Sequence, residues 1–325
     1  MSKRVTRRTF LKAGLYAGAA TATGLLLPGS VMAASGSQLC TLFDLTKCIG
    51  CEACVEACRD INATKFPVLE KPMPVMYPTD RVKIADWSSI EKQAVQDRLT
   101  PYNWLYVQTA RGSHEGREFE LNIPRRCMHC HNAPCVNLCP FGAAFAQNNG
   151  IVRIHPQVCM GGAKCKAACP WKIPERQSGV GSYMNLLPNY AGNGVMYKCD
   201  RCYDRVAQGE LPACIEACPK EVQTIGPRKE IIERARWLAD EMNGFIYGEK
   251  ENGGTNTLYV SPIPFDVLDA SIKTAAGRPH LNGVTAAMAS TNNLATALVA
   301  GPIIGAMAAV LQRKRAGGSP PDQKE

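Results

Sequence analysis

Cysteine is the residue type with the most chemistry to offer in this 325-residue chain, which contains sixteen of them. Fifteen fall into four groups with short internal spacings, and Cys40 stands alone ahead of them. The groups are Cys48-x2-Cys51-x2-Cys54-x3-Cys58, Cys127-x2-Cys130-x4-Cys135-x3-Cys139-Pro140, Cys159-x5-Cys165-x3-Cys169-Pro170 and Cys199-x2-Cys202-x11-Cys214-x3-Cys218-Pro219.

These spacings are typical of cubane iron–sulfur sites. Three close thiolates on one loop can bind three irons, and in bacterial ferredoxin runs the fourth cysteine of a group ligates the other cluster. Thiolate is the ligand that soft iron sites take, and a proline after the last cysteine helps turn the chain away. The sequence therefore predicts four cluster sites arranged as reciprocal pairs.

Three other uses of the cysteines compete with this interpretation. A disulfide framework is common in exported chains but does not explain the recurring three-residue step. Zinc ribbons use paired Cys-x2-Cys knuckles, whereas Cys48 to Cys58 supplies four ligands in one short run. Cys127-Met128-His129-Cys130-His131 contains the haem-attachment motif, although Cys135 and Cys139 complete an iron–sulfur group around it.

The N-terminal residues 1–34 have the features of a twin-arginine signal peptide. Thr6 to Lys12 matches the export pattern, an apolar stretch follows from Ala13 to Leu27, and Val31-Met32-Ala33 is a small-residue cleavage site. An ordinary basic terminus before a core helix is the alternative. Because this pathway exports folded proteins, the signal predicts a cofactor protein on the periplasmic side.

The C-terminal part predicts a membrane anchor over 284–312. Leu294 to Leu311 is an uncharged run of 18 residues, which at ~1.5 Å per residue just spans the hydrocarbon core. Arg313-Lys314-Arg315 then predicts a cytoplasmic tail over 313–325.

The composition of the predicted span bears on its partners. Gly301 and Gly305 form a small-xxx-small pair, which would let a helix of an integral membrane partner approach closely. Pro302 and the high alanine content keep a buried soluble helix as the alternative.

Charge and motifs exclude several function classes. The formal charge is +9, but five of the cations lie in the predicted signal, which leaves about +4, and only 7% of residues are aromatic. We therefore expect no nucleic-acid partner. No phosphate-binding or dinucleotide glycine motif and no substrate-activating constellation is present, which predicts a non-catalytic subunit. The five cations are Lys3, Arg4, Arg7, Arg8 and Lys12.

The fold predicted from these features is α+β, with two ferredoxin-like modules carrying insertions and a C-terminal transmembrane helix. Each cysteine loop should lead into a short helix that runs on through the final cysteine, and short strands such as Gly150 to Ile154 should alternate with them. The predicted parts are 35–125 (first cluster motif and insertion), 126–172 (inner ferredoxin module) and 173–280 (fourth cluster motif and C-terminal extension).

Three segments between the motifs carry further predictions. The proline-rich stretch from Phe66 to Tyr77 should be an irregular insertion, and residues 172–198, with several glycines, should be a loop insertion. Glu230 to Met242 has helical spacing, with one apolar face for core packing.

The chain resembles the four-cluster ferredoxin subunits of membrane-bound respiratory oxidoreductases. Within them it resembles the HybA-type subunit of periplasmic uptake nickel–iron hydrogenases, through Leu42-Phe43-Asp44, Asp60-Ile61-Asn62 and Tyr247 to Glu251. The beta subunit of formate dehydrogenase is nearly as similar, through Gly253 to Val260 and Asp204 to Cys214.

The resemblance implies a pairing of group one with four and of group two with three. One position departs from the family pattern, because Gly162 stands where the family usually has a cysteine ligand. The implied ligand sets are Cys48, Cys51, Cys54 and Cys218 (site 1), Cys58, Cys199, Cys202 and Cys214 (site 2), Cys127, Cys130, Cys135 and Cys169 (site 3), and Cys139, Cys159 and Cys165 (site 4).

Three thiolates at site 4 suit a [3Fe–4S] cluster, and an incompletely ligated [4Fe–4S] cluster is the alternative. Cys40 precedes group one and would lie beside the wrong pair to complete site 4. The expected cofactors are thus three [4Fe–4S] clusters and one [3Fe–4S] cluster. The expected role is electron relay between a periplasmic hydrogenase catalytic subunit and a quinone-linked membrane subunit; a formate dehydrogenase or another molybdopterin enzyme is the alternative partner.

Overall fold

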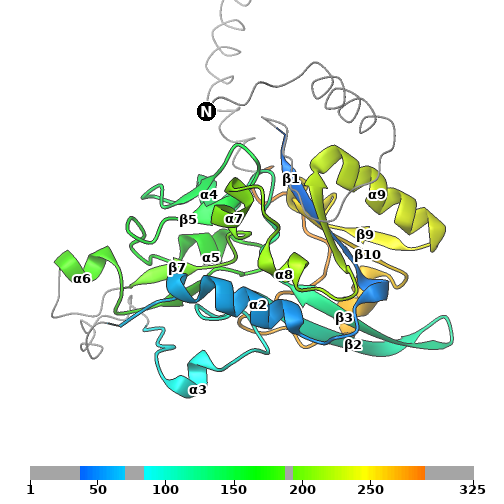
Figure 1. Cartoon of the computed structure of the whole chain (residues 1–325), viewed down its shortest axis with the longest axis horizontal. Helices are drawn as coiled ribbons and strands as arrows, with labels where there is room; N and C mark the ends of the chain where they lie inside the picture. Colours follow the sequence, from blue (N-terminus) through cyan, green and yellow to red (C-terminus); the bar gives the residue numbers. More distant parts are fainter. Residues whose placement is uncertain (1–36, 70–83, 187–192, 290–325) are drawn as a thin grey trace, which may run out of the picture.

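The computed structural model describes residues 37–69, 84–186 and 193–289. Short strands and short helices alternate along the chain (Figure 1). The strands are β1 (Leu39–Asp44), β2 (Tyr106–His114), β3 (Arg117–Arg125), β4 (Ala144–Ala146), β5 (Val152–Ile154), β6 (Glu175–Gln177), β7 (Val195–Tyr197), β8 (Gln223–Pro227), β9 (Phe245–Tyr247) and β10 (Thr257–Ser261). The helices are α2 (Ala53–Asn62), α3 (Ile90–Gln93), α4 (Pro134–Asn137), α5 (Lys164–Ala168), α6 (Ser182–Leu186), α7 (Tyr203–Ala207), α8 (Ala213–Glu216), α9 (Arg228–Glu241) and α10 (Phe265–Ser271), with 3-10 turns η1 (Leu45–Lys47), η2 (Ala63–Lys65) and η3 (Glu251–Gly253).

A four-stranded sheet brings the two ends of the described chain together. Its strand order is β8-β1-β10-β9; β1 is parallel to β10 and antiparallel to β8. Every residue of β1 and β10 is buried, because α9 covers one face and the cysteine-rich core covers the other. Side chains of a strand alternate between faces, so Leu42 packs under α9 while Phe43 stacks on Tyr259, with ring centroids 4.8 Å apart. Because β1 directly precedes group one, the pairing of β1 with β10 places group one close to the segment around Thr257–Ser261.

The predicted helix over Glu230 to Met242 is confirmed as α9, which begins two residues earlier and ends one residue sooner. Ile231, Ala235 and Ala239 on one face of α9 are buried against the sheet. Core packing is thus the role of this helix, as its spacing indicates.

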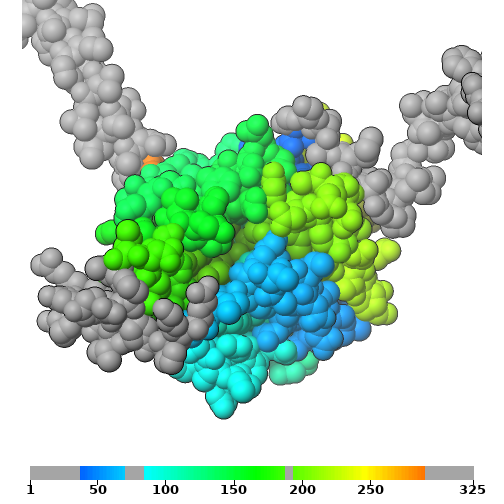
Figure 2. Space-filling view, turned by 60° about the vertical axis from the view of Figure 1, so that its left-hand side comes forward, coloured from blue at the N-terminus to red at the C-terminus, as the bar shows by residue number. Residues whose placement is uncertain are grey.

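Helix pairs connect the cysteine groups as the resemblance implies. Helix α2, from group one, packs against α8 from group four, and α4 of group two packs against α5 of group three. In Figure 2 the early part of the chain (blue) lies directly beside the yellow-green part that contains group four. The described chain thus contains two units, each made of two paired cysteine groups.

The prediction that each helix runs through the final cysteine of its group is correct for α2 and wrong for the others. α2 contains Cys58, whereas α4, α5 and α8 each end one or two residues before the last cysteine of their group. The difference follows from proline: Pro140, Pro170 and Pro219 disfavour helical backbone at the cysteine before them, while Arg59 follows Cys58.

The insertions are more structured than predicted. Residues 172–198 contain the paired strands β6 and β7 and helix α6, so the prediction of a plain loop is wrong there. Strands of three residues are too short to show a hydrophobic periodicity in the sequence, and the glycines around them favoured the interpretation as a loop. Phe66 to Leu69 has no strand or helix, as predicted, and the rest of that stretch lies outside the described residues.

The predicted signal (1–34) and most of the predicted anchor (284–312), with its tail, also lie outside the described residues. Among the described residues, no helix has both the length and the hydropathy that a membrane span requires. Both assignments remain predictions.

Candidate metal centres

Group one and the end of group four surround the first cavity. Cys48, Cys51, Cys54 and Cys218 line one pocket. Gly50 and Glu52 have positive φ of 72° and 59°, so the loop curls around the cavity before α2 begins. The structure thus brings together the thiols of site 1.

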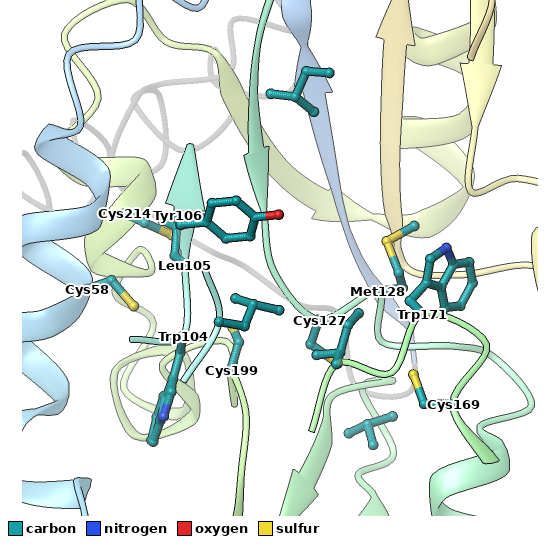
Figure 3. Packing of buried hydrophobic residues seen from close by; sticks show 14 of the residues in the cluster. Cys58, Trp104, Leu105, Tyr106, Cys127, Met128, Cys169, Trp171, Cys199 and Cys214 are labelled. Carbon is teal, nitrogen blue, oxygen red and sulfur yellow. The ribbon is translucent and has the colours of Figure 1, made fainter. Parts of the chain in front are cut away.

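The thiols of site 2 lie deeper, between α2 and α8. Cys58, Cys199, Cys202 and Cys214 are all buried, and Figure 3 shows three of them on one side of the apolar core. Asn62 Nδ2 lies 3.7 Å from Cys58 Sγ and 3.9 Å from Cys202 Sγ. Burial raises the pKa of the Cys58 thiol well above its ordinary value, and Cys199, Cys214 and Cys202 raise it further, so the four thiols are mutual neighbours.

Site 3 combines group two with the end of group three. Cys127, Cys130, Cys135 and Cys169 line one pocket. The segment from Gly253 that supports the family resemblance lies against this site. Its Thr255 forms a β-bridge with Cys130, and Gly254 accepts a backbone hydrogen bond from His131.

Site 4 has three thiols. Cys139, Cys159 and Cys165 line one pocket together with Gly162. The neighbours of Gly162, Gly161 and Ala163, have positive φ of 61° and 54°. A Cβ atom added at Gly162 would meet no atom within 4 Å, so the fourth position of the site is open space.

Neighbouring sites are connected by short stretches of chain. Cys54 and Cys58 lie on α2 and serve sites 1 and 2, and Cys165 and Cys169 serve sites 4 and 3. Sites 2 and 3 are neighbours at Lys198, which lines the site 3 pocket and directly precedes Cys199 of site 2. The chain therefore connects the four sites to one another in the order 1, 2, 3, 4.

Comparison with known proteins identifies the family. Two models described as "4Fe-4S dicluster domain" match residues 47–143 and 119–228. The chain is 30% identical over 311 residues to the hydrogenase-2 operon protein HybA of Escherichia coli O157:H7, covering 82% of this chain and 83% of the relative. This chain belongs to the 4Fe-4S dicluster family that includes HybA.

Other relatives extend this family assignment. A protein of Nitratidesulfovibrio vulgaris is 32% identical over 275 residues, which are 80% of this chain but only 65% of that longer protein. The iron–sulfur subunit of nitrate-inducible formate dehydrogenase from Escherichia coli K12 is 29% identical over 247 residues, 74% of each chain. The predicted resemblance to both the hydrogenase and formate dehydrogenase subunits is therefore confirmed.

The surroundings of the thiols fit the 4Fe-4S clusters of this family. Each site has a backbone N–H that donates to a cysteine sulfur, and such donors stabilise the thiolate over the thiol. Hydrogen bonds to sulfur also tune clusters. The donor–sulfur distances are 3.4 Å for Val222 to Cys218, 3.3 Å for Arg201 to Cys199, 3.4 Å for His129 to Cys127, 3.5 Å for Ala144 to Cys139 and 3.4 Å for Met196 to Cys159.

Burial, the largest cause, raises the pKa of several thiols: to about 12 for Cys54, Cys135 and Cys165 and to about 11 for Cys169. Thiols with raised pKa stay protonated at neutral pH. Cluster binding at these sites must therefore release protons, since the thiolate is the metal ligand.

All sixteen cysteines lie in the described ranges and all are free thiols. In the haem-like motif, Cys127 and Cys130 line site 3, and the His129 ring is buried and accepts a hydrogen bond from Val152 N.

Cys40 belongs to none of the four sites. It lies fully buried in β1, on the face under α9 with Leu42 and Ile231, and burial raises the pKa of its thiol to about 11. The alternation of β1 places it on the face away from Phe43 and the cysteine-rich core. Its role in the described structure is core packing.

Two residues close to site 2 were not predicted from the sequence. Asn62 was noted only as part of the family resemblance, and Arg126 was not noted at all. Arg126 precedes Cys127 and is 2% exposed, with its Nη1 3.4 Å from Cys214 Sγ. A cation beside a group-two cysteine is a visible signal, but its contact with a group-four cysteine depends on the tertiary fold.

Proposed function

We propose that this chain relays electrons between a periplasmic hydrogenase catalytic subunit and a quinone-linked subunit of the membrane. The succession of four thiol sites carries the proposal, because short stretches of chain connect each site to the next: α2 connects sites 1 and 2, Lys198-Cys199 connects sites 3 and 2, and Cys165 to Cys169 connects sites 4 and 3. When bound, clusters of this kind supply one-electron transfer. The protein's own part is to bind the clusters through buried thiols and to orient N–H donors toward the sulfurs.

The proposed cofactors are three [4Fe–4S] clusters at sites 1, 2 and 3 and one [3Fe–4S] cluster at site 4. The three thiols and the open space at Gly162 support the three-iron assignment, since glycine offers no ligand. Iron quantitation with low-temperature EPR on the anaerobically purified full chain tests this. An oxidised three-iron signal is expected, which disappears on dithionite reduction; protein without iron would refute the proposed function.

The proposed location is the periplasmic face of the cytoplasmic membrane. The twin-arginine pattern at Thr6 to Lys12 and the uncharged run from Leu294 to Leu311 support export and a C-terminal anchor. Fractionation of cells producing the chain, with and without Arg7→Lys and Arg8→Lys, tests the export route. Persistence of the double variant in the periplasm would contradict it.

The hydrogenase partner rests on the similarity to HybA over most of both chains. A formate dehydrogenase complex is the second candidate, supported by the 29% identity to its iron–sulfur subunit. Anaerobic membranes containing the native complex distinguish the two. Hydrogen gas should reduce the EPR-active clusters in the first case, and formate should do so in the second.

A further inference from the structure

Arg126 is a buried cation whose guanidinium has few hydrogen-bond partners among the described residues. Its side chain is 2% exposed, and Nε and Nη2 have no hydrogen-bond partner in the described residues. Nη1 donates to Cys214 Sγ at 3.4 Å, and the guanidinium carbon lies 5.1 Å from the ring centroid of Phe43. A guanidinium stays protonated in proteins, so this position holds a fixed positive charge.

A buried charge without a partner is strongly destabilising. The only atom that accepts a hydrogen bond from this guanidinium in the described structure is a cysteine sulfur of site 2. All four thiols of site 2 are buried, whereas site 1 includes the exposed Cys51. Charges interact more strongly in the protein interior than at the surface. The negative charge that the cation requires is therefore that of the cluster-bound thiolates.

We propose that Arg126 is a positioning residue that raises the reduction potential of the cluster bound by Cys58, Cys199, Cys202 and Cys214. Reduction adds one electron to this site and makes or breaks no bond, so the site becomes more negative by one charge. A fixed cation and an N–H donor at Cys214 stabilise the more negative state. The inference rests on the proposed function, because it requires a redox cluster at site 2.

The neighbouring residue supplies a matched control. Arg125 is equally buried, but its Nη2 donates to the carbonyl oxygens of Pro279 at 3.1 Å and His280 at 2.7 Å. It lies over the Tyr259 ring, 5.9 Å from the centroid. Arg125 thus binds the C-terminal segment through neutral acceptors, whereas Arg126 contacts a sulfur.

The test is an EPR-monitored redox titration of the purified full-length protein and its Arg126→Met variant. One [4Fe–4S] step should shift to lower potential by at least a tenfold change in its reduction equilibrium, which is about 59 mV for one electron. Arg126→Lys, which keeps the charge, should recover most of the shift. Arg125→Met should leave every step in place.

Unchanged potentials in a cluster-loaded Arg126→Met protein would overturn the inference while leaving the proposed function intact. Absence of clusters in the unmodified protein would instead refute the proposed function. If Arg126→Met fails to bind four of its irons, Arg126→Gln replaces it as a polar neutral variant. Loss of those irons in Arg126→Gln and Arg126→Lys alike would also overturn the inference, since it would show a packing role independent of charge.

Discussion

The loops at sites 1 and 4 have the same backbone design with a different residue at the centre. Gly50-Cys51-Glu52 and Gly161-Gly162-Ala163 each place positive φ on both sides of the central residue, and each is followed by a helix, α2 or α5. In each loop the cysteines line a pocket together with the central residue. Cys48-x2-Cys51-x2-Cys54 is matched by Cys159-x2-Gly162-x2-Cys165. The loop conformation is therefore independent of the central thiol, and one side chain distinguishes a four-donor from a three-donor site.

The largest expected change comes from removing a thiol where only three exist. Cys165→Ala leaves two thiols at site 4, too few for a cubane-type cluster, so the protein should lose about three irons and its oxidised EPR signal. Iron quantitation measures the loss. Cys40→Ala is the matched control, since Cys40 is equally buried but outside the four sites. Equal iron loss in both variants would contradict the assignment of site 4.

Adding the missing thiol should convert site 4 into a copy of site 1. The open space at Gly162 accommodates a cysteine side chain, so Gly162→Cys should gain about one iron and lose the oxidised three-iron signal. EPR of the oxidised protein is the readout. Gly162→Ala, which fills the space without a ligand, should behave like the unmodified protein. A persistent signal in Gly162→Cys would show that the fourth position is not set by this residue.

The reciprocal change at site 1 should be smaller. Cys51→Gly leaves Cys48, Cys54 and Cys218, and Cys51 is exposed, so water can take the fourth position. The loss should therefore not exceed about one iron, with a second three-iron signal in the fraction that loses it. Spin quantitation of the oxidised protein checks this. Complete loss of the site 1 cluster would mean that the two loops are not equivalent.

The smallest effect on iron is expected at Gly161. An added Cβ there would overlap the backbone of Asn193 and Gly194, and its φ of 61° is unfavourable for other residues. Gly161→Ala should keep its iron yet lose roughly 1–3 kcal/mol of stability. Gly162→Ala should change stability by about 0.5 kcal/mol or less. Thermal unfolding of the two variants under anaerobic conditions compares them; equal midpoints would contradict the close contact.

The sequence allowed a prediction of the cysteine groups, the α+β class and α9 because local spacing carries those signals. It did not predict the β2–β3 hairpin, although Glu115 and Gly116, both with positive φ, form the two-residue turn typical of hairpins. The strands around that turn lie in a segment interpreted only as an insertion.

The environment of each site could not be predicted in the same way. The position of Arg126 beside Cys214 and of Cys40 under α9 depends on contacts between distant segments, and no local pattern encodes such contacts. The ligand sets were inferred from the family resemblance for the same reason. Spacing within one group does not specify which distant cysteine completes it.

Sites 1 and 2 each combine cysteines that are far apart in the chain, so neither site is complete until late in synthesis. Cys54 and Cys218 line one cavity but are about 160 residues apart in the chain. At roughly 5–20 residues per second, the ribosome needs about 10–30 s to make the intervening segment. During that interval the first three thiols have no fourth partner and remain open to oxidation or to other metals. Cells that make this chain therefore need to protect an incomplete site until the last cysteine emerges.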